Sequence, residues 1–371
     1  MTTVRDIASA LGVSPATVSR SLNHSGEVRE DLRNRVLLQA KRMGYQLPTR
    51  RTQPGAIGIC FLNEPAGPRF SGYDAVIWSG VARAARAHKL DLTTLDLQDR
   101  SPGESVASFL RTRSIEGLVL RVDNHTRDMA TDLAGHGIPV VVVAEQITSD
   151  DLGYVYCNSR PQSYAAVEHL IHLGHRRIAV AVNSVLDRDH QDRLEAYREA
   201  LAAYAIEPDP DLEIVMVADL DGGAAAVSRF MSLPSPPTAI FFTDPTATVG
   251  AMRRTLELGI RVPEELSIVG FDDEQSRCFT FPKYTAVCQP AADLGFAAGR
   301  WLAREIVTGR AGRSEPVRLE LQAFFEVNYT TGPPCEPVRV LPDGSRLQVE
   351  EPASTPHTPP DHTQRRSANG S

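Results

Sequence analysis

A twelve-residue segment near the amino terminus, GVSPATVSRSLN, constrains the fold of this chain more than any other feature. Gly12 can adopt the positive φ of a tight turn, and Ser14 followed by Pro15 is typical of a helix N-cap with proline at the first helical position. Val18 and Leu22 then fall one turn apart on one face. The segment predicts the turn and second helix of a helix-turn-helix, whose polar outer face suits the major groove of DNA.

Two further helices are predicted around this segment. The first has apolar residues at helical spacing and a capping-box pattern, carried by Val4, Ile7, Ala8 and Leu11 and by Thr3 with Asp6. The next covers residues 30–43 and is ended by Gly44. The alternative is a three-helix domain that binds no nucleic acid.

Charge is divided unevenly along the chain. Residues 1–56 carry nine Lys or Arg against four Asp or Glu, whereas the 371-residue chain has a net charge of −7. A basic head on an acidic body favours phosphate binding by the head alone and argues against a protein that coats DNA along its length. No apolar run approaches the ~20 residues that a membrane span needs. Five scattered cysteines and a start without a signal-peptide pattern predict a cytoplasmic protein with no membrane partner.

From residue 56 onward, apolar strand patterns alternate with helical ones. Nine strands are predicted, over residues 56–62, 90–97, 117–120, 140–144, 154–157, 178–182, 213–217, 239–242 and 267–271. This alternation predicts an α/β sensor of two doubly wound parallel-sheet lobes behind an all-α helix-turn-helix head. The resulting domains are a head (1–45), a linker (46–55), a two-lobed body (56–330) and a proline-rich disordered tail (331–371).

Four motifs in the same order resemble the LacI/GalR family of bacterial transcription regulators, and the resemblance covers about residues 2–330. They are TVRDIA with GVSPATVSRSLN in the head, HLIHLGHRRIA at residues 169–179, LGIRVP leading into SIVGFDD at residues 258–273, and YTAVCQP at residues 284–290. The resemblance implies a homodimeric repressor on a double-stranded DNA operator. It also implies a sensor similar to type I periplasmic binding proteins that takes a small-molecule effector.

The family's DNA contacts carry over where the motif matches. Arg20 is the candidate for bidentate reading of a guanine edge, and Pro15 and Ala16 could offer only apolar contact. The positions that match phosphate or backbone contacts are Thr3, Ser14, Thr17, Ser19 and Asn23. The alternative for Ser14 and Ser19 is capping of, or back-bonding to, their own helix.

The family's effector site carries over in the same way. Arg193 matches an arginine that clasps ligand hydroxyls or carboxylates, and Asp272 matches a hydroxyl-binding aspartate. The other candidates are Tyr73, Asp74, Glu145, Asp244 and Gln289, although Asp244 stands where the family usually has Asn. Arg193 could instead be a surface arginine, and Asp272 could merely cap the following turn. His169 and His175 are interpreted as structural residues.

Two acids (Asp244 and Asp272), the arginine Arg193 and the amide of Gln289 are expected in one cleft. This combination favours a sugar or related polyol as the effector. No motif indicates a cofactor, a metal or an enzyme. Two alternatives remain: a DNA-binding regulator whose sensor binds no ligand, and a solute-binding protein without DNA. A thermal-shift screen with sugars separates the first of these from a ligand-responsive regulator.

The linker departs from the family pattern. It is about five residues shorter than in typical relatives, and Pro48, Pro54 and Gly55 leave little room for a helix. We expect no hinge helix, with Arg50 and Arg51 serving as a minor-groove or phosphate arm and with weaker operator bending. A circular-permutation mobility assay that shows a sharp central kink would contradict this.

Overall fold

A computed structural model provides the architecture. It describes residues 3–22, residues 32, 35, 36, 38–40 and 43, and then 55–61, 72–122, 127–134, 138–150, 152–184, 187–273, 276–309 and 315–349. Residues 46–54 of the predicted linker, with Arg50 and Arg51, and the predicted DNA contact Asn23 lie outside these residues.

The head forms as the sequence predicts. Helix α1 (Val4–Leu11) starts at a capping box in which Thr3 N donates to Asp6 Oδ2 at 2.7 Å, and Gly12 follows it with φ +65°. Helix α2 (Pro15–Leu22) starts with Ser14, whose Oγ accepts from Thr17 N at 3.1 Å. The buried side chains of the head come from both helices and from the third helical segment: Ile7, Ala8, Val18, Val36 and Ala40.

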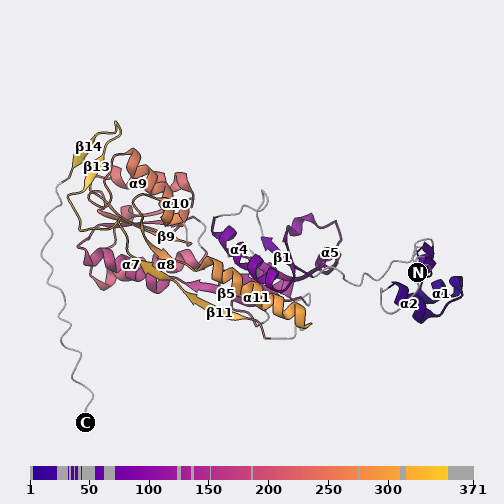
Figure 1. Cartoon of the computed structure of the whole chain (residues 1–371). Coiled ribbons are helices and arrows are strands. Elements are labelled where there is room, and N and C mark those ends of the chain that lie inside the picture. Colours follow the sequence, from indigo (N-terminus) through magenta and orange to yellow (C-terminus); the bar gives the residue numbers. More distant parts are fainter. Residues whose placement is uncertain are drawn as a thin grey trace, which may run out of the picture.

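Two α/β lobes form the body and lie side by side in Figure 1. The elements of the N lobe are β1 (Ala56–Phe61), α4 (Gly72–Ala87), β2 (Asp91–Leu95), η1 (Leu97–Asp99), α5 (Val106–Thr112), β3 (Ile115–Arg121), α6 (Arg127–Ala134), β4 (Val140–Val143), β5 (Gly153–Asn158), α11 (Ala291–Thr308) and β11 (Arg318–Gln322). The elements of the C lobe are α7 (Arg160–His172), β6 (Ile178–Asn183), α8 (Arg188–Ala203), η2 (Pro210–Leu212), β7 (Glu213–Met216), α9 (Leu220–Ser232), β8 (Ala239–Phe242), α10 (Pro245–Glu257), β9 (Ser267–Asp272), η3 (Ser276–Phe279), β10 (Thr285–Cys288) and β12 (Phe324–Glu326).

Both lobes have the predicted doubly wound sheet. The N-lobe order is β11-β5-β4-β3-β1-β2 and the C-lobe order is β12-β10-β9-β8-β6-β7, with all neighbours parallel except β10 and β12. All nine predicted strands are present. The strands β10, β11 and β12 were not predicted, because they are short and β11 and β12 are partly exposed.

The chain crosses between the lobes three times, after β5, after β10 and between β11 and β12. These three passes are neighbours. Gln322 pairs with Asn158 in the N-lobe sheet, and Phe324 pairs with Cys288 in the C-lobe sheet. The carboxyl ends of the parallel strands of both lobes therefore meet at one junction, where ligands of such folds bind.

Helices α4 and α11 pack together closely in the N lobe because glycines stand at their contact. A Cβ at Gly80 would lie 2.0 Å from the carbonyl oxygen of Ala292, and one at Gly295 would lie 1.8 Å from that of Ile77. This contact ties the helix that begins at the lobe junction to the helix that returns from the C lobe.

The predicted disordered tail is wrong for residues 331–349, which include a hairpin of β13 (Val338–Val340) and β14 (Arg346–Gln348). The apolar side chains of β13 are buried, and Val340 joins the C-lobe core. Arg346 pairs with Glu265 at 3.2 Å, and Arg339 donates to the Ser232 carbonyl at the end of α9. The prediction of disorder was based on proline-rich composition, which does not reveal that Val338 and Val340 are buried. Residues 350–371 lie outside the described part.

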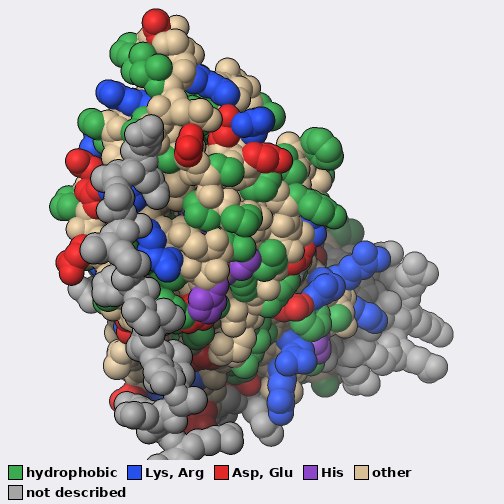
Figure 2. Space-filling model, turned by 90° about the vertical axis from the view of Figure 1, so that its left-hand side faces the viewer, with side chains coloured by type: hydrophobic (Ala, Val, Ile, Leu, Met, Phe, Trp, Pro, Cys, Tyr) green, Lys and Arg blue, Asp and Glu red, His purple; other side chains and the backbone are tan. Residues whose placement is uncertain are grey.

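On the face shown in Figure 2, charged side chains of both signs lie among scattered apolar ones. Across the described residues, no helix combines the length and the apolar character that a bilayer crossing requires.

Candidate functional site

The exposed start of α2 is the candidate nucleic-acid face. Ser14, Pro15 and Ala16 are exposed there, and Thr17 and Ser19 are half-buried. Ser14 Oγ accepts from Thr17 N at 3.1 Å, so its capping role is present, and it also lies 2.8 Å from the Thr17 hydroxyl. Ser14 remains exposed in this arrangement. Thr3 is occupied by its own capping box. Arg20 belongs to α2, but the structure does not describe its side chain.

Arg193 of α8 lies at the junction of the lobes and is only 4% exposed, so it is not a surface arginine. Its Nη1 donates to the Thr243 carbonyl at 2.7 Å, and its Nη2 lies 3.4 Å from Asp189 Oδ2. The guanidinium carbon lies 4.0 Å from the centre of the Phe271 ring, and Nε lies 3.4 Å from Ser159 Oγ at the first pass. The guanidinium is thus held in a fixed orientation.

The first turn of α8 adds residues that the sequence analysis did not single out. Asp187 caps the helix and accepts from His190 Nδ1 at 2.7 Å. Although burial opposes ionisation, hydrogen bonds from His190 lower the pKa of Asp187. Burial raises the pKa of Asp189 to about 7; Arg193 opposes this shift and the charge of Asp187 adds to it. One carboxyl group of this turn is therefore held ionised, and the other is near its titration point at neutral pH.

The N lobe contributes Tyr73 and Asp74 from the start of α4 and Arg121 from the end of β3. Arg121 Nε donates to Asp74 Oδ1 at 3.0 Å, and its Nη1 donates to the Val143 carbonyl at 3.0 Å. The pKa of Tyr73 is raised by burial and by the charge of Asp189, which belongs to the other lobe. The two lobes therefore face each other through these side chains. We call Tyr73, Asp74, Arg121, Asp189, His190, Arg193 and Gln289 the inter-lobe site.

Three buried polar atoms of the inter-lobe site have no hydrogen-bond partner among the residues that the structure describes: Tyr73 Oη, His190 Nε2 and Gln289 Oε1. Gln289 is 2% exposed and stands at the second pass, where its N donates to the Asp272 carbonyl at 2.9 Å. Unpaired buried polar groups are costly, and they commonly mark a place where a ligand or water completes the hydrogen bonding.

The remaining predicted effector residues already interact with other groups of the protein. Asp244 caps α10 by accepting from Ala247 N at 3.0 Å, and burial raises its pKa. Pro245 stands at the first helical position, where its missing N–H costs no helical hydrogen bond. Glu145 is buried just after β4 and raises the pKa of Asp189 electrostatically, after the effects of burial and of Asp187.

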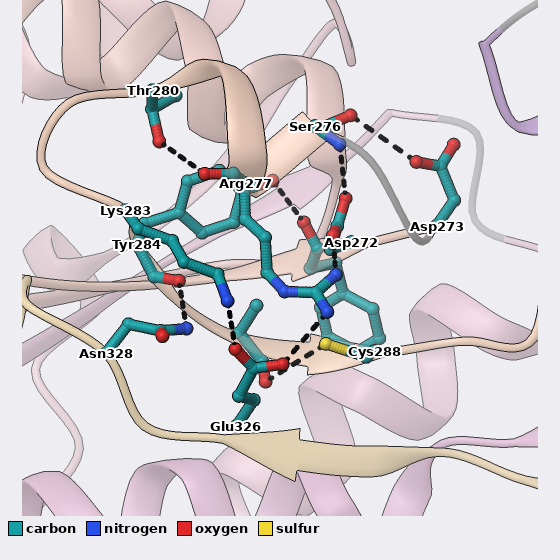
Figure 3. A network of polar contacts seen from close by, with 12 residues as sticks. Asp272, Asp273, Ser276, Arg277, Thr280, Lys283, Tyr284, Cys288, Glu326 and Asn328 are labelled. Atoms are coloured by element: carbon teal, nitrogen blue, oxygen red, sulfur yellow. Dashed lines mark hydrogen bonds and ion pairs between the residues drawn. The ribbon is translucent and has the colours of Figure 1, made fainter.

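Asp272 is fully buried at the end of β9 and is held by its own chain. Its Oδ1 accepts from Ser276 N at 2.8 Å, and its Oδ2 pairs with Arg277 Nη1 (Figure 3). The turn-capping alternative is therefore present in the structure. His175 is structural, as interpreted from the sequence, because Thr238 and Ser267 flank its ring nitrogens.

Two surface grooves lie away from the inter-lobe site. One of about 730 Å³ runs along β7 and α9, and one of about 480 Å³ follows the end of α10. Neither is lined by a predicted effector residue. Within the described residues, no group of three or more His, Cys, Asp or Glu side chains is placed to hold a metal ion.

The sequence did carry signals for the residues that were missed. Arg121 ends the apolar run Leu118–Leu120 of a predicted strand, and Asp187, Asp189 and His190 follow the strand at residues 178–182. Polar residues directly after buried parallel strands are placed at the ligand-binding edge. Their pairing across two lobes, however, depends on tertiary structure.

Comparisons with known proteins agree with this architecture. The family model of the bacterial regulatory proteins of the lacI family matches residues 3–47, and that of a periplasmic binding protein-like domain matches residues 167–323. The HTH-type transcriptional regulator reg1 of Streptomyces lividans is 31% identical over 326 residues, which cover 85% of this chain and 93% of the relative. The chain belongs to the LacI family.

Other LacI-family proteins match over similar lengths. The ribose operon repressor of Haemophilus influenzae is 27% identical over 314 residues, covering 82% of this chain and 92% of the relative. The solved structure of the transcriptional regulator CelR in complex with cellobiose matches with a TM-score of 0.63 at 26% identity, covering 89% of this chain and 100% of that one. The family consists of DNA-binding transcriptional regulators, and these relatives are regulators and repressors.

Proposed function

We propose that this LacI-family protein is a sequence-specific DNA-binding repressor whose affinity for its operator is controlled by a small hydroxyl-rich molecule, a sugar or related polyol, bound at the inter-lobe site. The observation that carries the proposal is the set of three buried atoms, Tyr73 Oη, His190 Nε2 and Gln289 Oε1, which find no hydrogen-bond partner in the described part of the chain. They come from the N lobe, the C lobe and the pass between them.

A polyol matches these atoms chemically. Each hydroxyl both donates and accepts, so one ligand can satisfy a phenol, an imidazole nitrogen and an amide oxygen together. Arg193 and Asp189 supply charge-assisted hydrogen bonds next to them. The ribose operon repressor and the CelR–cellobiose complex support a sugar by their names. Asp74 and Asp272 are proposed as further acceptors for ligand hydroxyls, and Glu145 and Asp244 as surrounding residues that shape the site.

The effector proposal is tested with the full chain. Thermal-shift measurements with a panel including D-ribose and cellobiose should show that one sugar raises the midpoint, because a ligand that binds only the folded state stabilises it. The same sugar should change the affinity for a promoter fragment, measured by fluorescence anisotropy. If no sugar or polyol of the panel shifts either measurement, the ligand-independent alternative replaces this proposal.

On the DNA side, we propose that Ser14, Thr17 and Ser19 contact phosphates and that Pro15, Ala16 and Arg20 face base edges, with Thr3, Asn23, Arg50 and Arg51 in supporting contacts. Arg20→Ala should cost roughly 1–3 kcal/mol of operator binding and relax the choice at one base pair. Unchanged affinity and specificity would remove Arg20 as a base reader.

We also propose that the protein acts as a homodimer, since paired heads can read two half-sites. Three large apolar side chains on one part of the C lobe support this: Leu256 of α10, and Phe279 and Phe281 of the segment after β9, are 67%, 81% and 91% exposed. Cys278 is exposed beside them. Sedimentation velocity should show a dimer, and Phe281→Asp should weaken it; a monomeric parent would overturn the assignment.

A further inference from the structure

Residues 276–283 connect the inner edge of the C lobe to its surface. The segment follows Asp272, at the junction end of β9, and returns into β10 through Lys283 and Tyr284. Between these ends it presents Phe279 and Phe281 to the outside. We call residues 276–283 the aromatic segment. One short stretch of chain therefore touches both the neighbourhood of the inter-lobe site and the apolar surface proposed for subunit contact.

Two carboxylates hold the aromatic segment at both of its ends, as Figure 3 shows. At its start, Ser276 N and Arg277 Nη1 donate to Asp272, and Arg277 Nη2 donates to Glu326 Oε2 at 2.9 Å. At its end, Lys283 Nζ donates to the other oxygen of Glu326 on β12. Arg277 is the side chain that joins the two carboxylates, so the position of the segment depends on it.

This network is charged and largely shielded from water. Asp272 is fully buried, and the side chain of Arg277 is 11% exposed. Hydrogen bonds from Lys283 lower the pKa of Glu326 to about 2, with Arg277 contributing. Burial works against the charge of Arg277, yet its hydrogen bonds with Asp272 and then Glu326 raise its pKa. Glu326 and Arg277 are therefore ionised at neutral pH, and removing a partner of the buried guanidinium leaves its charge less well compensated.

The Asp272–Arg277 contact can also be exchanged for another. Arg277 Nε is buried and has no hydrogen-bond partner within the described ranges, so these residues leave one donor of the guanidinium unsatisfied. The Asp272 carbonyl accepts from Gln289 N at 2.9 Å at the junction end of β9, and Gln289 Oε1 also lacks a partner among the described residues. A ligand hydroxyl that reaches Asp272 Oδ2 from the inter-lobe site would compete with Arg277 for it, while Glu326 keeps hold of the arginine.

We propose that Arg277 couples the inter-lobe site to the aromatic segment: an effector hydroxyl that takes Asp272 displaces Arg277 from it, and residues 276–283 are then released at their inner end. This inference rests on the proposed effector site. The coupling changes the surface that carries Phe279 and Phe281, and through it the contact between subunits. Arg277 is a positioning residue here, since it acts through Asp272 and the segment.

The native cysteines provide a local probe. Cys278 and Cys335 are exposed, whereas Cys60, Cys157 and Cys288 are buried. Full-length Cys335→Ser therefore keeps one exposed thiol, next to Arg277. Its reaction rate with Ellman's reagent reports the freedom of the aromatic segment. The three buried thiols serve as an internal control, because global unfolding would add them to the reaction.

In this background, Asp272→Asn and Arg277→Met should each raise the Cys278 reaction rate by about tenfold, because each frees the inner end of the segment. The double variant should react no faster than the singles, since both remove one interaction. Arg277→Lys should lie between parent and Arg277→Met, because one ammonium cannot span both carboxylates in the manner of the fork. Arg198→Met is the control, removing a more exposed arginine–carboxylate pair with Glu213 at another place on the C lobe, and should leave the rate unchanged.

Rates within twofold of the parent for both Asp272→Asn and Arg277→Met would overturn the proposal. If Arg277→Met does not fold, Glu326→Gln and Asp272→Asn decide it in the same assay.

A second experiment adds the sugar of the panel that raises the thermal midpoint. This sugar should raise the Cys278 reaction rate in the parent and leave the rate of Arg277→Met unchanged. A sugar that binds without changing the parent's rate overturns the coupling and leaves the effector site standing. If no sugar binds, the effector site fails, and the variants alone decide whether Arg277 holds the segment.

Discussion

The two lobes share a strand order but differ in how they use the ends of their strands. In the described part of the N lobe, Arg121 stands there and is closed on Asp74 and a carbonyl of its own sheet. The C lobe places Asp187, Asp189, His190 and Arg193 on one helix, beside the buried Asp272. The shared topology fixes where functional side chains can stand, whereas the sequence of each lobe decides their charge. We infer that the C lobe sets the chemistry of the site and the N lobe completes it.

The largest effect is expected at Arg193. Arg193→Met removes a buried guanidinium from Asp189 and the Thr243 carbonyl, which should cost about 3 kcal/mol of stability. It should also abolish the effector response while operator binding persists. Thermal unfolding and anisotropy titrations measure both. Arg198→Met, on the exposed side of the same helix, should cost under about 1 kcal/mol. A normal effector response in Arg193→Met would break the comparison.

The next effect is a pH dependence at Asp189. Its pKa rises from an ordinary value of 3.8 to about 7 in the fold, so the folded chain keeps a proton that the unfolded chain has released. Asp189 therefore lowers stability as pH rises from about 4 to 7. Asp189→Asn lacks this penalty, and its stability relative to the parent should improve by about 3 kcal/mol between pH 4.5 and pH 8. Chemical denaturation at both pH values measures it. The exposed Asp150→Asn is the control, and an equal change there would refute the assignment.

Arg121→Met tests the N lobe directly. Its side chain is 22% exposed and paired with Asp74, so we expect a loss of about 1–2 kcal/mol, smaller than that for Arg193→Met. The effector response should weaken without disappearing. Dose–response curves for both variants with the same sugar sharpen the comparison. An equal or larger loss at Arg121 would show that both lobes share the recognition chemistry.

The smallest effect is expected at the hairpin, which the N lobe lacks. Arg346→Ala removes a partly exposed pair with Glu265 and should cost about 0.5 kcal/mol, or roughly 1–2 °C in the midpoint. Val340→Ala, in the core beneath, should cost more because Val340 is buried. If the order of these two variants is reversed, the hairpin is held by its charges rather than by its apolar face.

Local patterns predicted the parts of the fold that depend on neighbours in sequence. Thr3 with Asp6, Gly12 and Ser14 with Pro15 specify caps and a turn within a few residues of one another, and the structure confirms all three. The strand pattern likewise predicted both lobes. The hairpin was missed because its two buried valines are separated by one residue among prolines and charges.

The site was predicted only in part, because its contacts join distant segments. Arg193 and Gln289 are at the lobe junction as expected, and Asp272 is there but held by Arg277. That pairing depends on how the chain after β9 turns back, which no local pattern specifies. Asp189 was missed because its altered pKa arises from burial between two lobes.

The three neighbouring passes between the lobes have a consequence for motion. Three stretches of chain cross between the lobes side by side. We expect them to act as one hinge axis about which the lobes open, and to oppose sliding of one lobe along the other. Ser159 and Gln289 lie next to that axis and keep nearly the same neighbours at every degree of opening. Tyr73 belongs to the N lobe and Asp189 to the C lobe, so the distance between them changes with the angle between the lobes. We expect a molecule that contacts only Ser159 and Gln289 to bind without changing this angle. A molecule that also bridges Tyr73 and Asp189 would fix the angle between the lobes.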